Sequence, residues 1–261
     1  MEAILYVGHG SRVQEGNEQL RNFVTQCKKR FPNIPIQHTC FIELEQPSIL
    51  EGIKNCVDQG ATVIAVMPIL LLTAGHAKED IPKEISKARE LYPSIKFKYG
   101  RPFGVEKLIV DVLKQRLIAT GLKEEAIDGK SKENERQSVA VLLIGRGSSD
   151  PDANSDLFKI ARLLWEYTPI QHVECAYLAA TTPTVDQGLE RLLKEPVDQV
   201  ILLPYLLFTG ILMKSLEQKR KEKQMLTSKE LLLSKYLGFD DQLIEILKER
   251  VEEVLYGERD E

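Results

Sequence analysis

AILYVGHGSR (residues 3–12) returns later in the chain as AVLLIGRGSS (residues 140–149). Two further pairs keep the same order: QPSILEGI (46–53) matches TPTVDQGL (182–189), and VMPILLLT (66–73) matches LLPYLLFT (202–209). All three motifs recur at an offset of 136 or 137 residues. Such a constant offset indicates a tandem duplication of one structural unit.

Each repeat alternates short, β-branched apolar runs with longer stretches in which apolar residues recur every three or four positions. This alternation predicts an α/β fold in which a parallel four-stranded sheet carries helices on both faces, built twice. In the first repeat we expect strands near 3–7, 35–42, 62–68 and 96–99, and helices near 14–30, 47–58, 78–92 and 104–118. In the second repeat we expect strands near 139–144, 171–178, 199–204 and 231–236.

The segment 121–137 is densely charged and nearly free of large apolar side chains, so it contributes to neither core. It is predicted to be a linker between a first domain, 1–120, and a second domain, 138–261. A second polar run, KSLEQKRKEKQ (214–224), is interpreted as a solvated helix or loop. Its cations leave open the alternative that the run meets an anionic ligand.

Composition excludes several classes of protein. The chain is 43% hydrophobic and 28% charged, as globular proteins are, and its net charge of −4 lacks the basic footprint of a nucleic-acid binder. The four cysteines form no CxxC pair, which favours buried thiols. The uncharged stretch 60–77 is interrupted by Pro68 and fits a buried strand better than a membrane span. We expect a cytoplasmic protein without nucleic-acid or membrane partners.

Three ionisable side chains follow three different predicted strands of the first repeat: His9, Glu43 and His76. Ligands bind at the carboxyl ends of parallel strands, so these side chains are expected to converge. Two imidazoles and a carboxylate suit a first-row divalent metal and leave coordination positions open. The second repeat has Arg146, Ala179, and Leu212 or, with a gap, Ile211 at the matching positions.

Other motifs carry weaker signals. Glu45 lies two residues from Glu43 and is an alternative carboxylate for the site, whereas His38 and His172, matched to each other inside strand runs, are interpreted as structural. The sequence around Gly8 lacks the third glycine of GxGxxG, which argues against a dinucleotide cofactor. Ser11 is expected to cap the following helix or to offer donors to an anion.

ILYVGHGSR, FIELEQPSI and MPILLLTAGHAKEDIP together resemble the class II chelatases of tetrapyrrole synthesis, above all the long, two-domain sirohydrochlorin chelatases of bacilli. The resemblance implies a chelatase-like fold with the active site in a cleft between the two domains. It implies a lyase that inserts Fe2+ into sirohydrochlorin to give siroheme, or Co2+ for cobalamin synthesis, with His9, Glu43 and His76 as catalytic and metal-binding residues. The chain ends in VEEVLYGERDE, without the histidine-rich or cysteine-containing tail of many cobalt-directed members, which favours iron.

An apolar macrocycle with a carboxylate rim needs a few polar or cationic contacts, for which the candidates are Ser11, Arg12, Lys78, Arg101 and Arg146. No cofactor is expected beyond the substrate metal. The two repeats, fused in one chain with pseudo-twofold internal symmetry, predict a monomer. Two rival functions stay open on the sequence: a histidine phosphatase using His9, and a metal carrier that binds no macrocycle.

Overall fold

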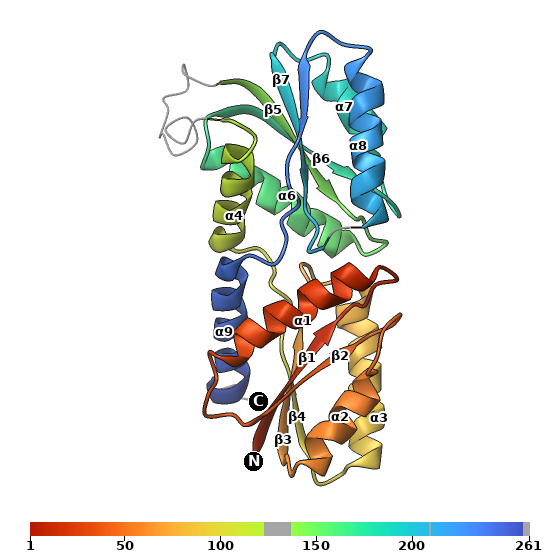
Figure 1. The fold of residues 1–261 in the computed structure, drawn as a ribbon, viewed down its shortest axis with the longest axis vertical. Helices are drawn as coiled ribbons and strands as arrows, with labels where there is room; N and C mark the ends of the chain where they lie inside the picture. The colour runs from red at the N-terminus through yellow and green to blue at the C-terminus, as the bar shows by residue number, and fades with distance from the viewer. Residues whose placement is uncertain (123–136, 209, 258–261) are drawn as a thin grey trace. The chain divides into compact units, whose positions relative to one another are not determined.

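The computed structural model describes residues 1–122, 137–208 and 210–257 (Figure 1). The chain folds into two compact units: unit 1 is Met1–Gly104 together with Asp241–Glu261, and unit 2 is Val105–Asp240. Each unit contains one parallel four-stranded sheet with helices on both faces. The predicted α/β fold with two parallel sheets is therefore confirmed.

Unit 1 is built around the sheet order β2-β1-β3-β4. Helices α2 and α3 cover one face, and α1 and α9 lie together on the other (Figure 1). Strand β1 is buried on both faces, as expected for a central strand of a covered parallel sheet. The elements are β1 (Glu2–Gly8), α1 (Gln14–Lys28), β2 (Ile36–Phe41), α2 (Ile49–Asp58), β3 (Val63–Pro68), η1 (His76–Asp80), α3 (Ile81–Leu91), β4 (Lys96–Tyr99) and α9 (Asp241–Tyr256).

Unit 2 repeats this plan with the sheet order β6-β5-β7-β8. Helices α7 and α8 cover one face, and α4 and α6 cover the other (Figure 1). The elements are α4 (Lys107–Ile118), β5 (Gln137–Gly145), α6 (Pro151–Glu166), β6 (Ile170–Tyr177), α7 (Val185–Leu192), β7 (Gln199–Pro204), α8 (Ile211–Gln224) and β8 (Glu230–Leu233). The strand order of the two units is the same, which matches the sequence repeat.

The bounds of the compact units differ from the predicted domains 1–120 and 138–261, because each unit takes its last helix from the other repeat. Helix α4 follows β4 in the sequence but packs on α6 and β7 of unit 2, and α9 follows β8 but packs on α1, β3 and β4 of unit 1. We call this arrangement the helix exchange. Most of the predicted linker, residues 123–136, lies outside the described part of the chain.

Two matching arginines hold the exchanged helices. Arg116 of α4 donates to the Tyr236 and Leu237 carbonyl oxygens and pairs with Asp240 at 2.8 Å. Arg250 of α9 is 2% exposed and donates to the Phe103 carbonyl oxygen at 3.1 Å. Charge-assisted hydrogen bonds to buried carbonyls are among the stronger ones in proteins, so these arginines fix each helix on the unit that it completes.

The predicted strands and helices agree with the observed bounds to within about three residues. One predicted helix, 78–92, differs from the structure. The helical segment begins two residues earlier, at His76, with the π-helical turn η1, and continues as the α-helix α3. All four cysteines are buried free thiols, and burial raises the pKa of Cys56 and Cys175 to about 12. Among the described helices, none has the length and apolar composition that a membrane crossing requires.

Candidate metal centre

The loop after β1 is tied to the loop after β2 by backbone hydrogen bonds. The Ile42 amide donates to the Gly8 carbonyl oxygen at 2.9 Å, and the Glu43 amide donates to the His9 carbonyl oxygen at 3.1 Å. Gly10 has φ +92°, and a Cβ atom there would lie 1.8 Å from the Glu43 carbonyl oxygen. Only glycine fits this crossing, so Gly10 is what allows His9 and Glu43 to stand side by side.

Glu43 and Glu45 have separate environments. Glu43 is half exposed, and its Oε1 lies 3.6 Å from His9 Nε2. Glu45 accepts hydrogen bonds from Asn17 Nδ2 at 2.6 Å and from the Gln46 amide, and pairs with Arg21 at 3.3 Å. The Glu45 carboxylate is therefore engaged in joining the loop to α1, and the geometry favours Glu43 as the carboxylate of the site.

His76 is the first residue of η1, beyond the carboxyl end of β3. Its Nδ1 lies 2.6 Å from Asp80 Oδ2, within the same turn. The turn is held from below by Tyr99, whose hydroxyl donates to the Ala77 carbonyl oxygen at 2.8 Å. Burial raises the pKa of Tyr99, which keeps this hydroxyl protonated. Asp80 was not among the site residues predicted from the sequence, where its i+4 spacing from His76 was the one available signal.

The structure brings His9, Glu43 and His76 together, each offering one ligand atom within 4.8 Å of the other two. The two imidazole rings meet edge to face, with centroids 4.6 Å apart and planes at 85°. The His9 Nδ1 atom lies 3.0 Å from the Gly10 carbonyl oxygen, which can only accept a hydrogen bond. Nδ1 therefore carries a hydrogen, and Nε2, which lies 3.6 Å from Glu43 Oε1, is the nitrogen that can bind a metal when the ring is neutral.

The exposed fractions of the three side chains rise from His9 (17%) through His76 (31%) to Glu43 (49%). The imidazoles form the inner part of the cluster, and the carboxylate lies nearest the solvent. A divalent ion would meet the carboxylate first and two imidazole nitrogens behind it. Three such ligands leave coordination positions free for a second molecule.

Unit 2 keeps the same backbone without the ligands. The Ala179 amide donates to the Arg146 carbonyl oxygen at 2.9 Å, and Gly147 has φ +90° with the Ala179 carbonyl oxygen 1.9 Å from a built Cβ atom. Arg146 and Ala179 thus occupy the positions of His9 and Glu43. Both η1 and α8 follow a glycine, Gly75 and Gly210, which favours the gapped match of His76 with Ile211.

The substrate-binding candidates fall into different environments. The Ser11 hydroxyl accepts from the Val13 amide at 3.0 Å, so it organises the loop before α1. Arg12 is an exposed residue of the loop that carries His9, and Lys78 is an exposed residue of η1. Arg146 is exposed directly after β5 of unit 2. Arg101 binds both carboxylate oxygens of Glu253 on α9, at 3.0 and 2.8 Å, which favours a structural role for this guanidinium.

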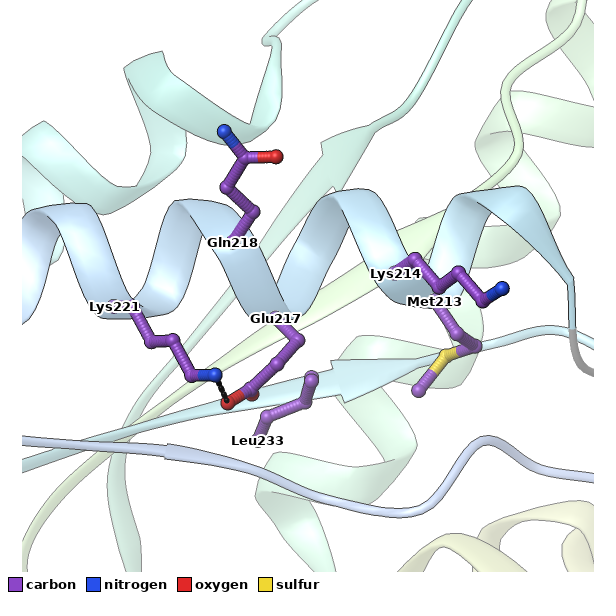
Figure 2. A pocket seen from close by; sticks show the side chains of 6 residues that line it. All are labelled: Met213, Lys214, Glu217, Gln218, Lys221 and Leu233. Carbon is purple, nitrogen blue, oxygen red and sulfur yellow. Dashed lines mark ion pairs between the residues drawn. The ribbon is translucent and has the colours of Figure 1, made fainter.

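The basic run 214–224 lies on α8, where its cations meet nearby acids. Lys221 pairs with Glu217 at 3.6 Å, Arg220 binds the same carboxylate, and Lys219 donates to Asp186 of α7. Figure 2 shows the Lys221–Glu217 pair beside a surface hollow of about 480 Å³ in unit 2. The hollow is lined by Met213, Lys214, Glu217, Gln218, Lys221 and Leu233. These ion pairs favour a solvated helix over an anion site.

The remaining two histidines lie inside strands, as expected, but they are not equivalent. Leu5 of β1 pairs with His38, whereas the matching Leu142 of β5 pairs with Glu174. His172 therefore sits two residues earlier in its strand than His38 does. His38 Nε2 contacts Gln59 at 2.8 Å, and His172 Nε2 lies 3.5 Å from Glu195. The two histidines therefore contact different residues beside their strands.

Comparison with known proteins matches both repeats to one family model, described as CbiX, over residues 3–120 and 140–254. A sirohydrochlorin cobaltochelatase of Priestia megaterium is 45% identical over 99% of this chain and 81% of its own length. A sirohydrochlorin ferrochelatase of the same organism is 44% identical over 98% of this chain and 91% of its own length. The solved structure of SirB from Bacillus subtilis with Fe3+ superimposes with a TM-score of 0.84, at 39% identity, covering 98% of this chain and 96% of that one.

Replacing Gly10 by alanine tests the loop crossing. We expect Gly10→Ala to destabilise the protein by on the order of 1–3 kcal/mol, because the added Cβ atom strains the left-handed backbone and collides with the Glu43 carbonyl oxygen. Urea unfolding measures the loss, and a Co2+ titration followed by visible absorption measures whether His9 and Glu43 still act together.

The matched control is Gly147→Ala, which introduces the same collision in the repeat without the ligands. It should cost similar stability but leave Co2+ binding unchanged. Equal losses of Co2+ binding in both variants would contradict the local effect that we assign to Gly10.

Proposed function

Because the chain belongs to the CbiX family, we propose that it is a sirohydrochlorin ferrochelatase, a lyase that inserts Fe2+ into sirohydrochlorin and releases two protons. The observation that carries the proposal is the cluster of His9, Glu43 and His76 in one unit, with ligand atoms within 4.8 Å of one another. The matching positions of the other unit have lost these groups. A requirement of the fold alone would apply equally to both repeats, so the retained cluster points to chemistry.

In the proposed mechanism the three side chains hold the incoming metal. Bond lengths of about 2.1 Å to nitrogen and oxygen place two ligands of a tetrahedral ion about 3.4 Å apart. The 3.6 Å between His9 Nε2 and Glu43 Oε1 is close to this separation, and a ligand atom of His76 lies within 4.8 Å of both. Neutral imidazoles and one carboxylate bind Fe2+ without the tight grip of thiolates, which suits a metal that must be passed on.

Metal insertion replaces two pyrrole N–H protons of the macrocycle by one divalent ion. The protons need acceptors beside the metal, and imidazole and carboxylate groups both serve this purpose near neutral pH. One of the two histidines, together with Glu43, fills this role once the metal has left it. The greater exposure of Glu43 gives the protons a route to solvent.

The carboxylate rim of sirohydrochlorin calls for cationic partners. We assign this role to Arg12 of the loop that carries His9, to Lys78 of η1, and to Arg146, which takes the position of His9 in the second repeat. Guanidinium groups bind carboxylates through two parallel hydrogen bonds. Arg101 is left out of this set because its donors bind Glu253.

Cobalt insertion is the second candidate. Its support is the 45% identity to a cobaltochelatase, which is close to the 44% identity to a ferrochelatase. The ligand set accepts both metals, since imidazole and carboxylate donors suit Fe2+ and Co2+ alike. We also propose that the protein acts as a monomer in the cytoplasm, where its four buried free thiols are stable.

Alanine replacement of His9, Glu43 or His76 tests the mechanism. Each variant is expected to lose Fe2+ insertion by at least about 100-fold, because a metal ligand or proton acceptor is removed. Insertion is followed anaerobically by the absorption change of the macrocycle. His38→Gln and Glu45→Gln are the controls, since they alter a histidine and a carboxylate outside the cluster, and both should keep insertion. Loss in Glu45→Gln with retention in Glu43→Ala would instead make Glu45 the carboxylate.

Competition between the two metals tests the proposed preference. With equal Fe2+ and Co2+ at limiting enzyme under anaerobic conditions, siroheme should form faster than cobalt-sirohydrochlorin. The two products are separated by chromatography and quantified, and the amounts that form without enzyme are subtracted. A product dominated by cobalt would replace the first candidate by the second.

Arg146→Ala tests the substrate contact. Loss of a charge-assisted hydrogen bond of about 1.5–3 kcal/mol should weaken sirohydrochlorin binding by about 10- to 100-fold, while Co2+ binding by the protein alone stays the same. The control Arg191→Ala removes the same charge from α7 of unit 2. Unchanged macrocycle affinity in Arg146→Ala would remove this residue from the site.

A further inference from the structure

Asp80 and His76 are joined by a hydrogen bond across the π-helical turn η1, with 2.6 Å between Oδ2 and Nδ1. A carboxylate accepts hydrogen bonds, so the proton of this bond resides on Nδ1. In the neutral ring the lone pair is then on Nε2, the atom that remains for a metal. Asp80 thus engages one nitrogen of the His76 ring and leaves Nε2 as the nitrogen available to a metal.

The backbone under this pair is fixed on several sides. The Ala77 and Lys78 amides both donate to the Ala74 carbonyl oxygen, at 2.9 and 3.0 Å, and the Ile81 amide donates to the His76 carbonyl oxygen. Ala77 is 4% exposed, and its own carbonyl oxygen accepts from Tyr99. Because the backbone of the turn is fixed, the orientation of the His76 ring depends on its side-chain torsions. The hydrogen bond to Asp80 restricts those torsions.

The second repeat lacks both members of the pair. At the gapped match, Ile211 and Ser215 stand for His76 and Asp80, and at the ungapped match Leu212 and Leu216 do. The segment there is an ordinary α-helix, α8. The acid is therefore absent from the repeat that has no histidine to orient. The other histidine of the cluster, His9, is oriented instead by a neutral acceptor, the Gly10 carbonyl oxygen.

We propose that Asp80 is a positioning residue for metal insertion: it fixes the tautomer and ring orientation of His76 and raises the donor strength of Nε2. This inference rests on the proposed function, since it gives His76 a metal to hold. Carboxylate partners of metal-binding histidines contribute about 10- to 100-fold to metal affinity. The charged partner makes His76 the stronger nitrogen donor of the two, while His9, with its neutral partner, is the weaker one.

The test is a Co2+ titration of the protein alone, followed by visible absorption. Asp80→Ala should weaken Co2+ binding by about 10- to 100-fold, whereas Asp80→Asn, which keeps an oxygen acceptor, should recover most of the loss. In steady-state insertion, the same loss should fall on the KM for the metal, with the KM for sirohydrochlorin unchanged. Glu79→Gln is the matched control, because it removes a negative charge one residue away, and it should change Co2+ affinity by less than about 2-fold.

Histidine side-chain ¹⁵N resonances give a readout that a purely structural role would not move. The signal that disappears in His76→Ala should show an Nδ1–H tautomer in the parent protein and a mixture of tautomers in Asp80→Ala. Parent-like Co2+ affinity and tautomer in a folded Asp80→Ala protein would overturn the inference. If His76→Ala also binds Co2+ as the parent does, the proposed function fails rather than the role of Asp80.

Discussion

The hydrogen bond from the Glu43 amide to the His9 carbonyl oxygen, made across Gly10, is the constraint on which the cluster depends. It joins the loops after two neighbouring strands at a distance that excludes any side chain on residue 10. The parallel order β2-β1-β3 then brings the loop after β3 alongside. His9 and Glu43 are therefore placed by backbone geometry, before any interaction between their side chains contributes.

The same constraint exists in unit 2, where Gly147 lets the Ala179 amide reach the Arg146 carbonyl oxygen. The crossing is thus a property of the fold, and the ligands are a property of one repeat. This separation explains how a duplicated chain can change the chemistry of one half while keeping its architecture. The crossing accepts arginine and alanine in one repeat and histidine and glutamate in the other, because its hydrogen bonds join backbone atoms.

Much of this arrangement could be predicted from the sequence, because it follows from patterns that are local. Buried parallel strands are continuous apolar runs, and residues after such runs gather at one edge of the sheet. Asp80 could not be recognised in this way. It is one exposed acid in the polar run HAKED, and its role depends on the direction of a single side-chain bond. The mismatch of His38 and His172 arose because a two-residue shift keeps a strand residue on the same face.

The helix exchange could not be predicted from the sequence, for a different reason. Helices α4 and α9 occupy equivalent places in the two repeats, so their apolar patterns alone do not indicate which sheet each one covers. What distinguishes them is contact between residues remote in sequence. Lys98 donates to the Leu255 carbonyl oxygen and Arg101 binds Glu253, in both cases across more than 150 residues of chain. Unit 1, which carries the cluster, is therefore completed only when the C-terminal helix is in place. Substitutions in α9 act on the stability of the unit that holds His9, although they lie in the repeat that lacks the ligands.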